Sequence, residues 1–93
     1  MKYLNIAPEA VVVSDDIIGI FDLDTSTVKA DTRNMLKRME NEGKVKNAFD
    51  PVFDIPLTFV LTCEKNNRES EKIIFSSTSL ATIKGRVFET KKN

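Results

Sequence analysis

The sequence predicts a small α+β domain, with a mostly antiparallel sheet of about five or six short strands and two helices. Short runs rich in β-branched and aromatic residues recur along the chain, separated by polar or proline-containing turns. One long segment without proline or glycine has apolar side chains at helical spacing, and a shorter one lies near the C-terminus. At 93 residues, we expect residues 1–93 to form a single domain.

Three strands are predicted in the N-terminal part. Residues 3–6 alternate weakly and open the sheet, while 11–13 and 17–21 are short, β-branched and apolar. The polar residues 14–16 between them predict a tight turn joining two largely buried strands. Gly19 interrupts the third run, so we expect a β-bulge or a close neighbour at that position.

Residues 28–42 are predicted to form an amphipathic helix that packs on the sheet. Residues 24–27 supply capping side chains before it, and Gly43 follows as a C-terminal stop. The apolar side chains that share one helix face are Val28, Met35, Leu36 and Met39. We interpret the methionines as core residues rather than ligands.

Three more strands are predicted in the middle and C-terminal parts of the chain. Residues 45–49 form a short strand, and a loop with two prolines follows over 50–56. Residues 57–63 give the strongest strand pattern of the chain. A polar turn over 65–69, longer than the two-residue type, then leads to a returning strand at 72–76.

A second helix is predicted near the C-terminus. The candidate N-caps are Ser77, Thr78 and Ser79. The apolar side chains on one side of the helix are Leu80, Ile83 and Val87. Gly85 weakens the helix by ~1 kcal/mol relative to alanine, so we expect it to depend on tertiary or subunit contacts.

Composition excludes several classes of site. The chain has 14 basic and 14 acidic residues and no histidine, which removes the commonest general base and transition-metal ligand. Cys63 is the single cysteine, so neither an internal disulfide nor a cysteine-rich zinc site can form. We therefore expect no catalytic residue, no metal site and no cofactor.

The N-terminus lacks an apolar signal sequence and no apolar run approaches ~20 residues, which predicts a cytoplasmic protein without a membrane span.

Charge is distributed unevenly although the total is zero. Residues 1–26 carry −4, 27–48 carry +3, 49–63 carry −2 and 64–93 carry +3. A mixed solvated surface accounts for this pattern, and so does a surface that steers partners or orders subunits.

The predicted helix over 28–42 carries a basic stripe. Lys29, Arg33 and Lys37 stand at i, i+4 and i+8, with Arg38 beside them. Stacked like charges cost a few tenths of a kcal/mol per pair unless an anion meets them. The stripe is therefore either a solvated helix face or a site for an anionic partner.

An Asp-x-Asp-Thr sequence follows the apolar run at 17–21. It resembles the nucleophile motif of haloacid-dehalogenase phosphatases, and that resemblance implies Asp22 as nucleophile and Asp24 as acid/base, with Mg²⁺ bridging. The chain is too short for the parallel three-layer sheet of those enzymes, and 76–79 lacks their later acidic pair. The alternative is that both aspartates end a strand and lead into a helix N-terminus, where negative charge is favourable.

Cys63 has no histidine to activate it and is interpreted as an inert thiol.

Two stretches of sequence together suggest a family. The segment VVSDDIIGIFD (12–22) leads into a helix ending NEGKV (41–45), and FSSTSLATIKGR (75–86) stands near the C-terminus. In this order and spacing they resemble the small bacterial extracellular-matrix regulatory proteins, the RemA/RemB-type family, and more closely its RemB-like branch. The likeness covers about residues 3–88. It implies a small cytoplasmic regulator, with a matrix-activating branch that forms ring-like oligomers and binds DNA through repeated arginines.

This chain departs from that branch at the arginine positions. Asp16 stands where the branch has an arginine after the first turn, and Asp54 and Ile55 stand where it has an arginine pair. Carboxylates repel phosphate, so these positions cannot serve as DNA contacts. The candidate nucleic-acid contacts are therefore other basic residues, namely Lys29, Arg33, Lys37, Arg38, Lys84 and Arg86.

Three functional hypotheses follow. The leading one is a non-enzymatic bacterial regulatory protein of the extracellular-matrix (biofilm) regulator family, a homo-oligomer, with a ring as one form, that acts by binding DNA. The alternative is a protein–protein interaction module without DNA binding, which the neutral charge and the missing arginines favour. The remote alternative is an aspartate-based, Mg²⁺-dependent phosphatase.

Overall fold

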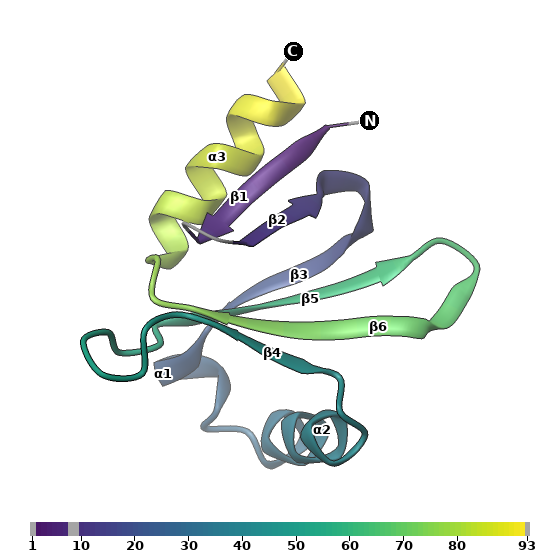
Figure 1. The fold of residues 1–93 in the computed structure, drawn as a ribbon, viewed down its shortest axis with the longest axis vertical. Helices are drawn as coiled ribbons and strands as arrows, with labels where there is room; N and C mark the ends of the chain where they lie inside the picture. Colours follow the sequence, from purple (N-terminus) through teal and green to yellow (C-terminus); the bar gives the residue numbers. More distant parts are fainter. Residues whose placement is uncertain (1, 8–9, 93) are drawn as a thin grey trace.

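The structure is a computed structural model that describes residues 2–7 and 10–92. The described residues form an α+β fold, as predicted, with a two-stranded sheet β1-β2 and a four-stranded sheet β3-β5-β6-β4 (Figure 1). The elements in chain order are β1 (Tyr3–Ala7), β2 (Ala10–Val13), the 3₁₀ turn η1 (Ser14–Asp16), β3 (Ile17–Asp22), α1 (Leu23–Ser26), α2 (Ala30–Asn41), β4 (Val45–Ala48), β5 (Thr58–Glu64), β6 (Asn67–Ser76) and α3 (Leu80–Lys92).

Pairing within the sheets is mostly antiparallel, which confirms that part of the prediction. β1 pairs with β2, β3 with β5, and β5 with β6 in antiparallel register. β4 lies parallel to β6 at the edge of the larger sheet, with Val45 opposite Ile73 and Ala48 opposite Ser76. The end of β3, the start of β5 and the ends of β4 and β6 therefore lie at one end of this sheet.

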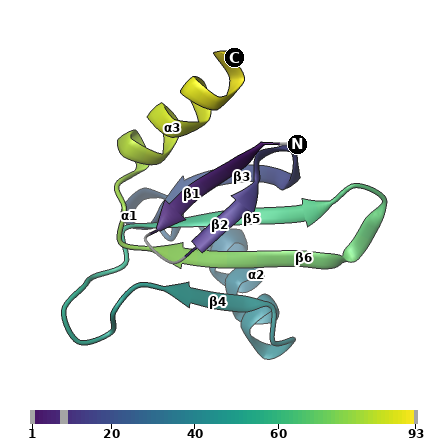
Figure 2. The same ribbon diagram turned by 45° about the horizontal axis from the view of Figure 1, so that its top comes forward.

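The four-stranded sheet has helix α2 on one face and the β1-β2 pair with α3 on the other (Figures 1 and 2). Successive residues of its central strands alternate between the two faces. Phe59 and Ile73 are buried under α2 with Met39, whereas Val60 and Ile74 are buried on the opposite face. The residues buried with Val60 and Ile74 are Leu4, Ile6, Ala7, Ala10 and Ile83.

Aromatic rings dominate the face under α2. The ring of Phe21 stacks on Phe59 with centroids 4.9 Å apart, and Phe59 meets Phe75 edge-on at 6.1 Å. The register of β3 against β5 shifts between Ile17 and Gly19, so the predicted bulge is confirmed. A Cβ on Gly19 would lie 2.6 Å from the Phe21 ring, which confirms the close neighbour as well.

The expectation for residues 11–21 was confirmed in part. Residues 14–16 form a 3₁₀ turn between two strands, as predicted, and these strands belong to different sheets, because β2 pairs with β1 and β3 with β5. The expected burial was wrong: Val11 and Ile18 are exposed, since β2 and β3 each have one unpaired edge and an outer face. Apolar β-branched runs indicated strands correctly but did not indicate their partners.

The long helix begins at Ala30 rather than at residue 28, and a separate short helix, α1, precedes it as a third helix. The N-cap of α2 is Lys29, which makes no side-chain capping bond, so the caps expected at 24–27 were wrong. Asp22 caps α1, with its Oδ1 accepting from the Asp24 amide at 2.8 Å. Val28 lies between the two helices and is exposed, so its expected place on the buried face was wrong. Gly43 follows α2 with φ 71°, which confirms it as the stop.

The loop between β5 and β6 was also predicted wrongly. β6 begins at Asn67, so the turn has two residues, 65 and 66, rather than the longer loop expected over 65–69. Asn66 has φ 63°, a left-handed conformation that asparagine tolerates in turns. The first half of β6 is polar and mostly exposed, so it lacks the apolar residues that would have predicted a strand there.

The C-terminal helix α3 begins after Ser79, whose Oγ accepts from the Thr82 amide at 3.3 Å. This confirms Ser79 among the three predicted caps. Ile83 of α3 is fully buried against β1 and the sheet. None of the described helices is long and apolar enough to cross a membrane.

Candidate functional site

The basic stripe predicted from the sequence lies on helix α2 and just before it. Lys29, Arg33 and Lys37 are all exposed. Within the described residues, Lys29 and Lys37 form no ion pair. The Arg33 guanidinium donates to the backbone oxygens of Thr27 at 2.7 Å and Val28 at 2.8 Å, which fixes its direction beside the start of the helix.

Arg38 has a different environment from the rest of the stripe. Its Nη1 lies 2.8 Å from Glu42 Oε2 and 3.4 Å from Glu71 Oε1, and Lys44 Nζ lies 3.4 Å from the same Glu71 oxygen. The hydrogen bond to Glu71, and then that to Glu42, raises the pKa of Arg38. Its charge is thus compensated within the chain, so Arg38 offers less to an external anion than Lys29 or Lys37.

Glu71 is the centre of this ion-paired cluster. Partial desolvation alone would raise the pKa of its carboxyl, but hydrogen bonds from Arg38 and Lys44 outweigh it, and the pKa is lowered. Through Arg38 and Lys44, the cluster joins α2 and the segment after it to Glu71 on β6. Its role is to hold α2 on the sheet.

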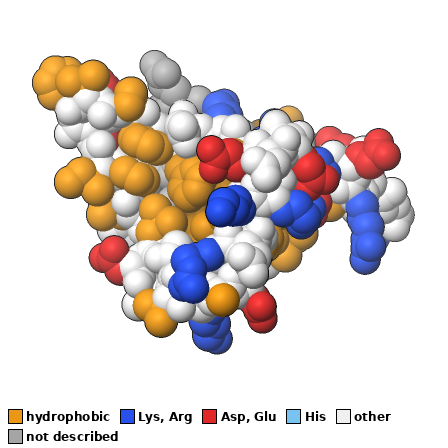
Figure 3. All heavy atoms as spheres, turned by 90° about the horizontal axis from the view of Figure 1, so that it is seen from below, with side chains coloured by type: hydrophobic (Ala, Val, Ile, Leu, Met, Phe, Trp, Pro, Cys, Tyr) orange, Lys and Arg blue, Asp and Glu red, His pale blue; other side chains and the backbone are white. Residues whose placement is uncertain are grey.

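The remaining two predicted contacts lie elsewhere. Lys84 is exposed on α3, and the Arg86 guanidinium donates to the backbone oxygen of Asn5 at 2.8 Å, tying α3 to β1. Since α2 and α3 cover opposite faces of the sheet, the structure does not bring the six predicted residues together (Figure 1). On the face that carries α2, basic and acidic side chains are interspersed and hydrophobic ones gather on one side (Figure 3).

The aspartates of the Asp-x-Asp-Thr sequence have a structural role. Asp22 caps α1 through its bond to the Asp24 amide, and Asp24 lies exposed in the first turn. Negative charge is favourable at this position because the free amides of a helix N-terminus point toward it. Within residues 2–7 and 10–92, no group of three histidine, cysteine or acidic residues is placed to hold a metal ion.

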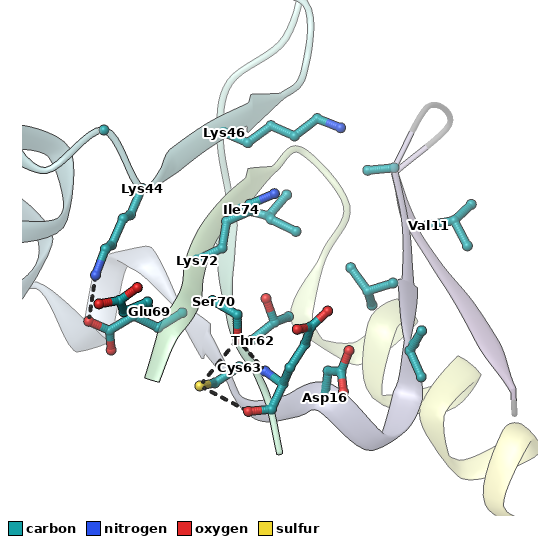
Figure 4. A pocket seen from close by; sticks show the side chains of 16 residues that line it. Val11, Asp16, Lys44, Lys46, Thr62, Cys63, Glu69, Ser70, Lys72 and Ile74 are labelled. Atoms are coloured by element: carbon teal, nitrogen blue, oxygen red, sulfur yellow. Dashed lines mark hydrogen bonds and ion pairs between the residues drawn. The ribbon is translucent and has the colours of Figure 1, made fainter. Parts of the chain in front are cut away.

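A hollow of about 540 Å³ lies between β2 and the part of the β5-β6 face nearest the hairpin turn (Figure 4). Lys46 and Lys72 enter it from neighbouring strands, while Asp16, Glu64 and Glu69 supply carboxylates. The residues 62, 63 and 70 contribute neutral polar groups, and the Cys63 thiol donates to the backbone oxygen of Asn67 at 3.2 Å. The mixture of both signs in an open hollow gives no defined ligand chemistry.

Sequence reasoning missed an exposed apolar loop between β4 and β5. Val52, Phe53 and Ile55 are 77%, 85% and 76% exposed, although each is a large hydrophobic residue. Asp50 Oδ1 accepts from the Val52 amide at 2.8 Å, and the Asp54 amide donates to the Asp50 backbone oxygen at 2.8 Å. The available signal is the apolar run Val52-Phe53 and Ile55 within a loop bounded by two prolines, Pro51 and Pro56.

Two of the positions where the resemblance expects arginines also fall in this loop. Asp54 and Ile55 are exposed there, and Asp54 Oδ2 accepts from the Asp50 amide at 3.3 Å. The third, Asp16, is half-buried in η1.

No family model matches the chain, and no curated protein matches it. The function must therefore be argued from this chain's own residues.

Proposed function

We propose that the protein is a non-enzymatic, cytoplasmic bacterial regulator of the extracellular-matrix (biofilm) type, which acts as a homo-oligomer and binds DNA through α2. The observation that carries the proposal is the exposed stripe of Lys29, Arg33 and Lys37. The sequence resemblance to the extracellular-matrix regulatory proteins supports the same function.

The chemistry of the stripe suits a phosphate backbone. Lys29 precedes the first turn of α2, where free amides add to the positive potential, and Lys37 lies two turns further along the same face. Each phosphate neutralised by a lysine or arginine releases condensed counterions, which drives binding at low salt. Three cations per chain give weak binding, and repetition in an oligomer strengthens it through avidity.

The acidic positions limit where DNA binds. Asp54 is exposed in the β4-β5 loop, and Asp22 and Asp24 lie at the same end of the sheet. Phosphate is repelled from this end. The proposal therefore assigns DNA contacts to α2 alone, with Lys84 and Arg86 on the opposite face outside the interface.

Fluorescence anisotropy with labelled bacterial promoter-region duplexes tests this proposal. We expect saturable binding whose affinity falls steeply between low and physiological salt. The double variant Lys29→Glu with Lys37→Glu is expected to lose at least tenfold in affinity at low salt, because two cations become anions on the interface.

The matched comparison uses the single variants Lys37→Glu and Lys84→Glu, which change the net charge equally on opposite faces of the sheet. The Lys37 variant is expected to bind more weakly, and the Lys84 variant to bind like the wild type. Size-exclusion chromatography establishes that each variant keeps its oligomeric state. Absence of binding at low salt, or an equal loss in the Lys84 variant, would overturn the assignment to α2. Absence of binding would favour the alternative of a protein–protein interaction module.

A further inference from the structure

The end of the sheet opposite the ion-paired cluster combines exposed apolar side chains with carboxylates. The backbone amide of Leu23, at the start of α1, donates to the Leu57 oxygen at 3.0 Å, which joins α1 to the end of the β4-β5 loop. The two segments that meet here, 21–28 and 49–63, contain four aspartates and no lysine or arginine. The exposed apolar residues at this end are Val52, Phe53, Ile55 and Leu57.

The loop is held in shape by its own hydrogen bonds. Asp50 accepts from the Val52 amide through Oδ1, and Asp54 accepts from the Asp50 amide through Oδ2. Both carboxylates thereby hold the loop backbone in place, and the side chain of Phe53 is 85% exposed. A loop backbone that is ordered before binding loses less entropy when a partner covers it.

None of the four aspartates at this end forms an ion pair within the described residues. Lys46 lines a hollow of about 460 Å³ beside the loop with Asp50 and Asp54, yet it is paired with neither carboxylate. The four aspartates are Asp22, Asp24, Asp50 and Asp54. This end therefore carries four aspartates without an ion pair among the described residues, beside exposed apolar side chains. Hydrophobic side chains gather at the left of Figure 3.

We propose that this end, which we call the loop surface (residues 22–24 and 50–57), binds a second protein through a segment with apolar side chains flanked by lysine or arginine. Apolar contacts with Phe53 supply the affinity, because large aromatic side chains at the centre of an interface carry most of its binding energy. The aspartates select basic flanks and exclude anionic partners such as nucleic acids. The proposal does not depend on DNA binding by α2.

A defined pair of peptides tests the charge selection. The probes are a fluorescein-labelled amphipathic helix of leucine and lysine and its counterpart of equal length in leucine and glutamate. We expect anisotropy to show saturable binding of the lysine peptide and at least tenfold weaker binding of the glutamate peptide. Absence of binding of the lysine peptide, or equal binding of both, would overturn the proposal.

Variants locate the binding site on the chain. Phe53→Ser is expected to weaken binding of the lysine peptide at least tenfold, and Asp54→Asn to weaken it less. Val11→Ser is the matched control, because Val11 is also exposed but lies on β2. An equal loss in the Val11 variant would overturn the location.

A fluorescent reporter and an assay of assembly complete the test. The chain contains no tryptophan, so Phe53→Trp introduces a single tryptophan, whose emission spectrum is expected to shift to the blue when the lysine peptide covers it.

Sedimentation velocity of Phe53→Ser examines self-association. An oligomer that dissociates in this variant would show that a second copy covers the loop, and would overturn the proposal. Unchanged duplex binding by Phe53→Ser would show that the two proposed surfaces are separate, and a loss of it would overturn the exclusion of nucleic acid.

Discussion

The two faces of the four-stranded sheet are covered in different ways. On the α2 face, Phe59 stacks on Phe21 and meets Phe75, and the ion-paired cluster around Glu71 ties the helix down at the rim. On the other face, described side chains of the buried cluster are aliphatic, and Ser76 Oγ donates to the Ile6 backbone oxygen at 2.6 Å. The first face concentrates its stability in a few large rings, whereas the second divides it among many small contacts.

The largest expected effect compares neighbouring residues that face opposite ways. Phe59→Ala is expected to destabilise the protein by about 3–5 kcal/mol, because it removes both ring contacts and leaves a cavity. Val60→Ala removes two methyl groups from the other face and is expected to cost about 2 kcal/mol. Urea denaturation measures both. Equal losses would show that the aromatic cluster is not the stronger of the two.

Ser76→Ala tests the polar link between the two sheets. Ser76 is fully buried, and its hydroxyl also accepts from the Thr78 amide at 3.0 Å. Its removal leaves the buried Ile6 oxygen without this donor, at an expected cost of about 1–3 kcal/mol. The same urea measurement applies. A neutral result would mean that packing alone holds β1-β2 on the sheet.

Gly85→Ala is expected to stabilise the aliphatic face. Gly85 is within helix α3, and a Cβ added there meets no atom within 4 Å. Alanine at this position is expected to add about 0.5–1 kcal/mol, because glycine loses more backbone entropy in a helix. A rise in Tm, measured by circular dichroism, checks the prediction. A fall in Tm would show that this part of α3 is not helical in solution.

The smallest effect is expected from Glu71→Gln on the α2 face, with a fall in Tm of ~2 °C at pH 7. Because its bonds to Arg38 and Lys44 lower the pKa of Glu71 below its ordinary 4.5, the charged carboxylate stabilises the fold above that value. This contribution is lost as the pH falls through the lowered pKa. Melting curves of the two proteins are therefore expected to differ at pH 7 and to converge in acid, and a constant difference would contradict the assignment.

The sequence supported strong predictions where hydrophobic periodicity alone decides the structure. Residues 57–63 predicted β5 within one residue, and Gly43 located the end of α2. The pattern carries no information on which strand pairs with which, so the assignment of 11–13 and 17–21 to separate sheets was missed. The polar composition of residues 65–69 predicted a longer turn than the two residues observed, because it did not reveal the left-handed conformation of Asn66.

The candidate site was predictable in part. Helical spacing placed Lys29, Arg33 and Lys37 together, and the structure confirms that they are exposed on one helix and its start. Spacing along α2 does not reveal its neighbours across the sheet, so the pairing of Arg38 with Glu71 was not foreseen. The exposure of Phe53 was missed for the same reason, since an apolar residue in a loop is either buried or outward-facing according to what the fold leaves beside it.

The two-residue turn between β5 and β6 has a consequence for the order of folding. These strands are the central pair of the sheet, and residues of both contribute to each buried cluster. Closing so short a loop costs little entropy, so we expect the β5-β6 hairpin to form early and the other elements to dock on it. Substitutions at residues 59 and 60 are therefore expected to slow folding, whereas Gly85→Ala slows unfolding instead.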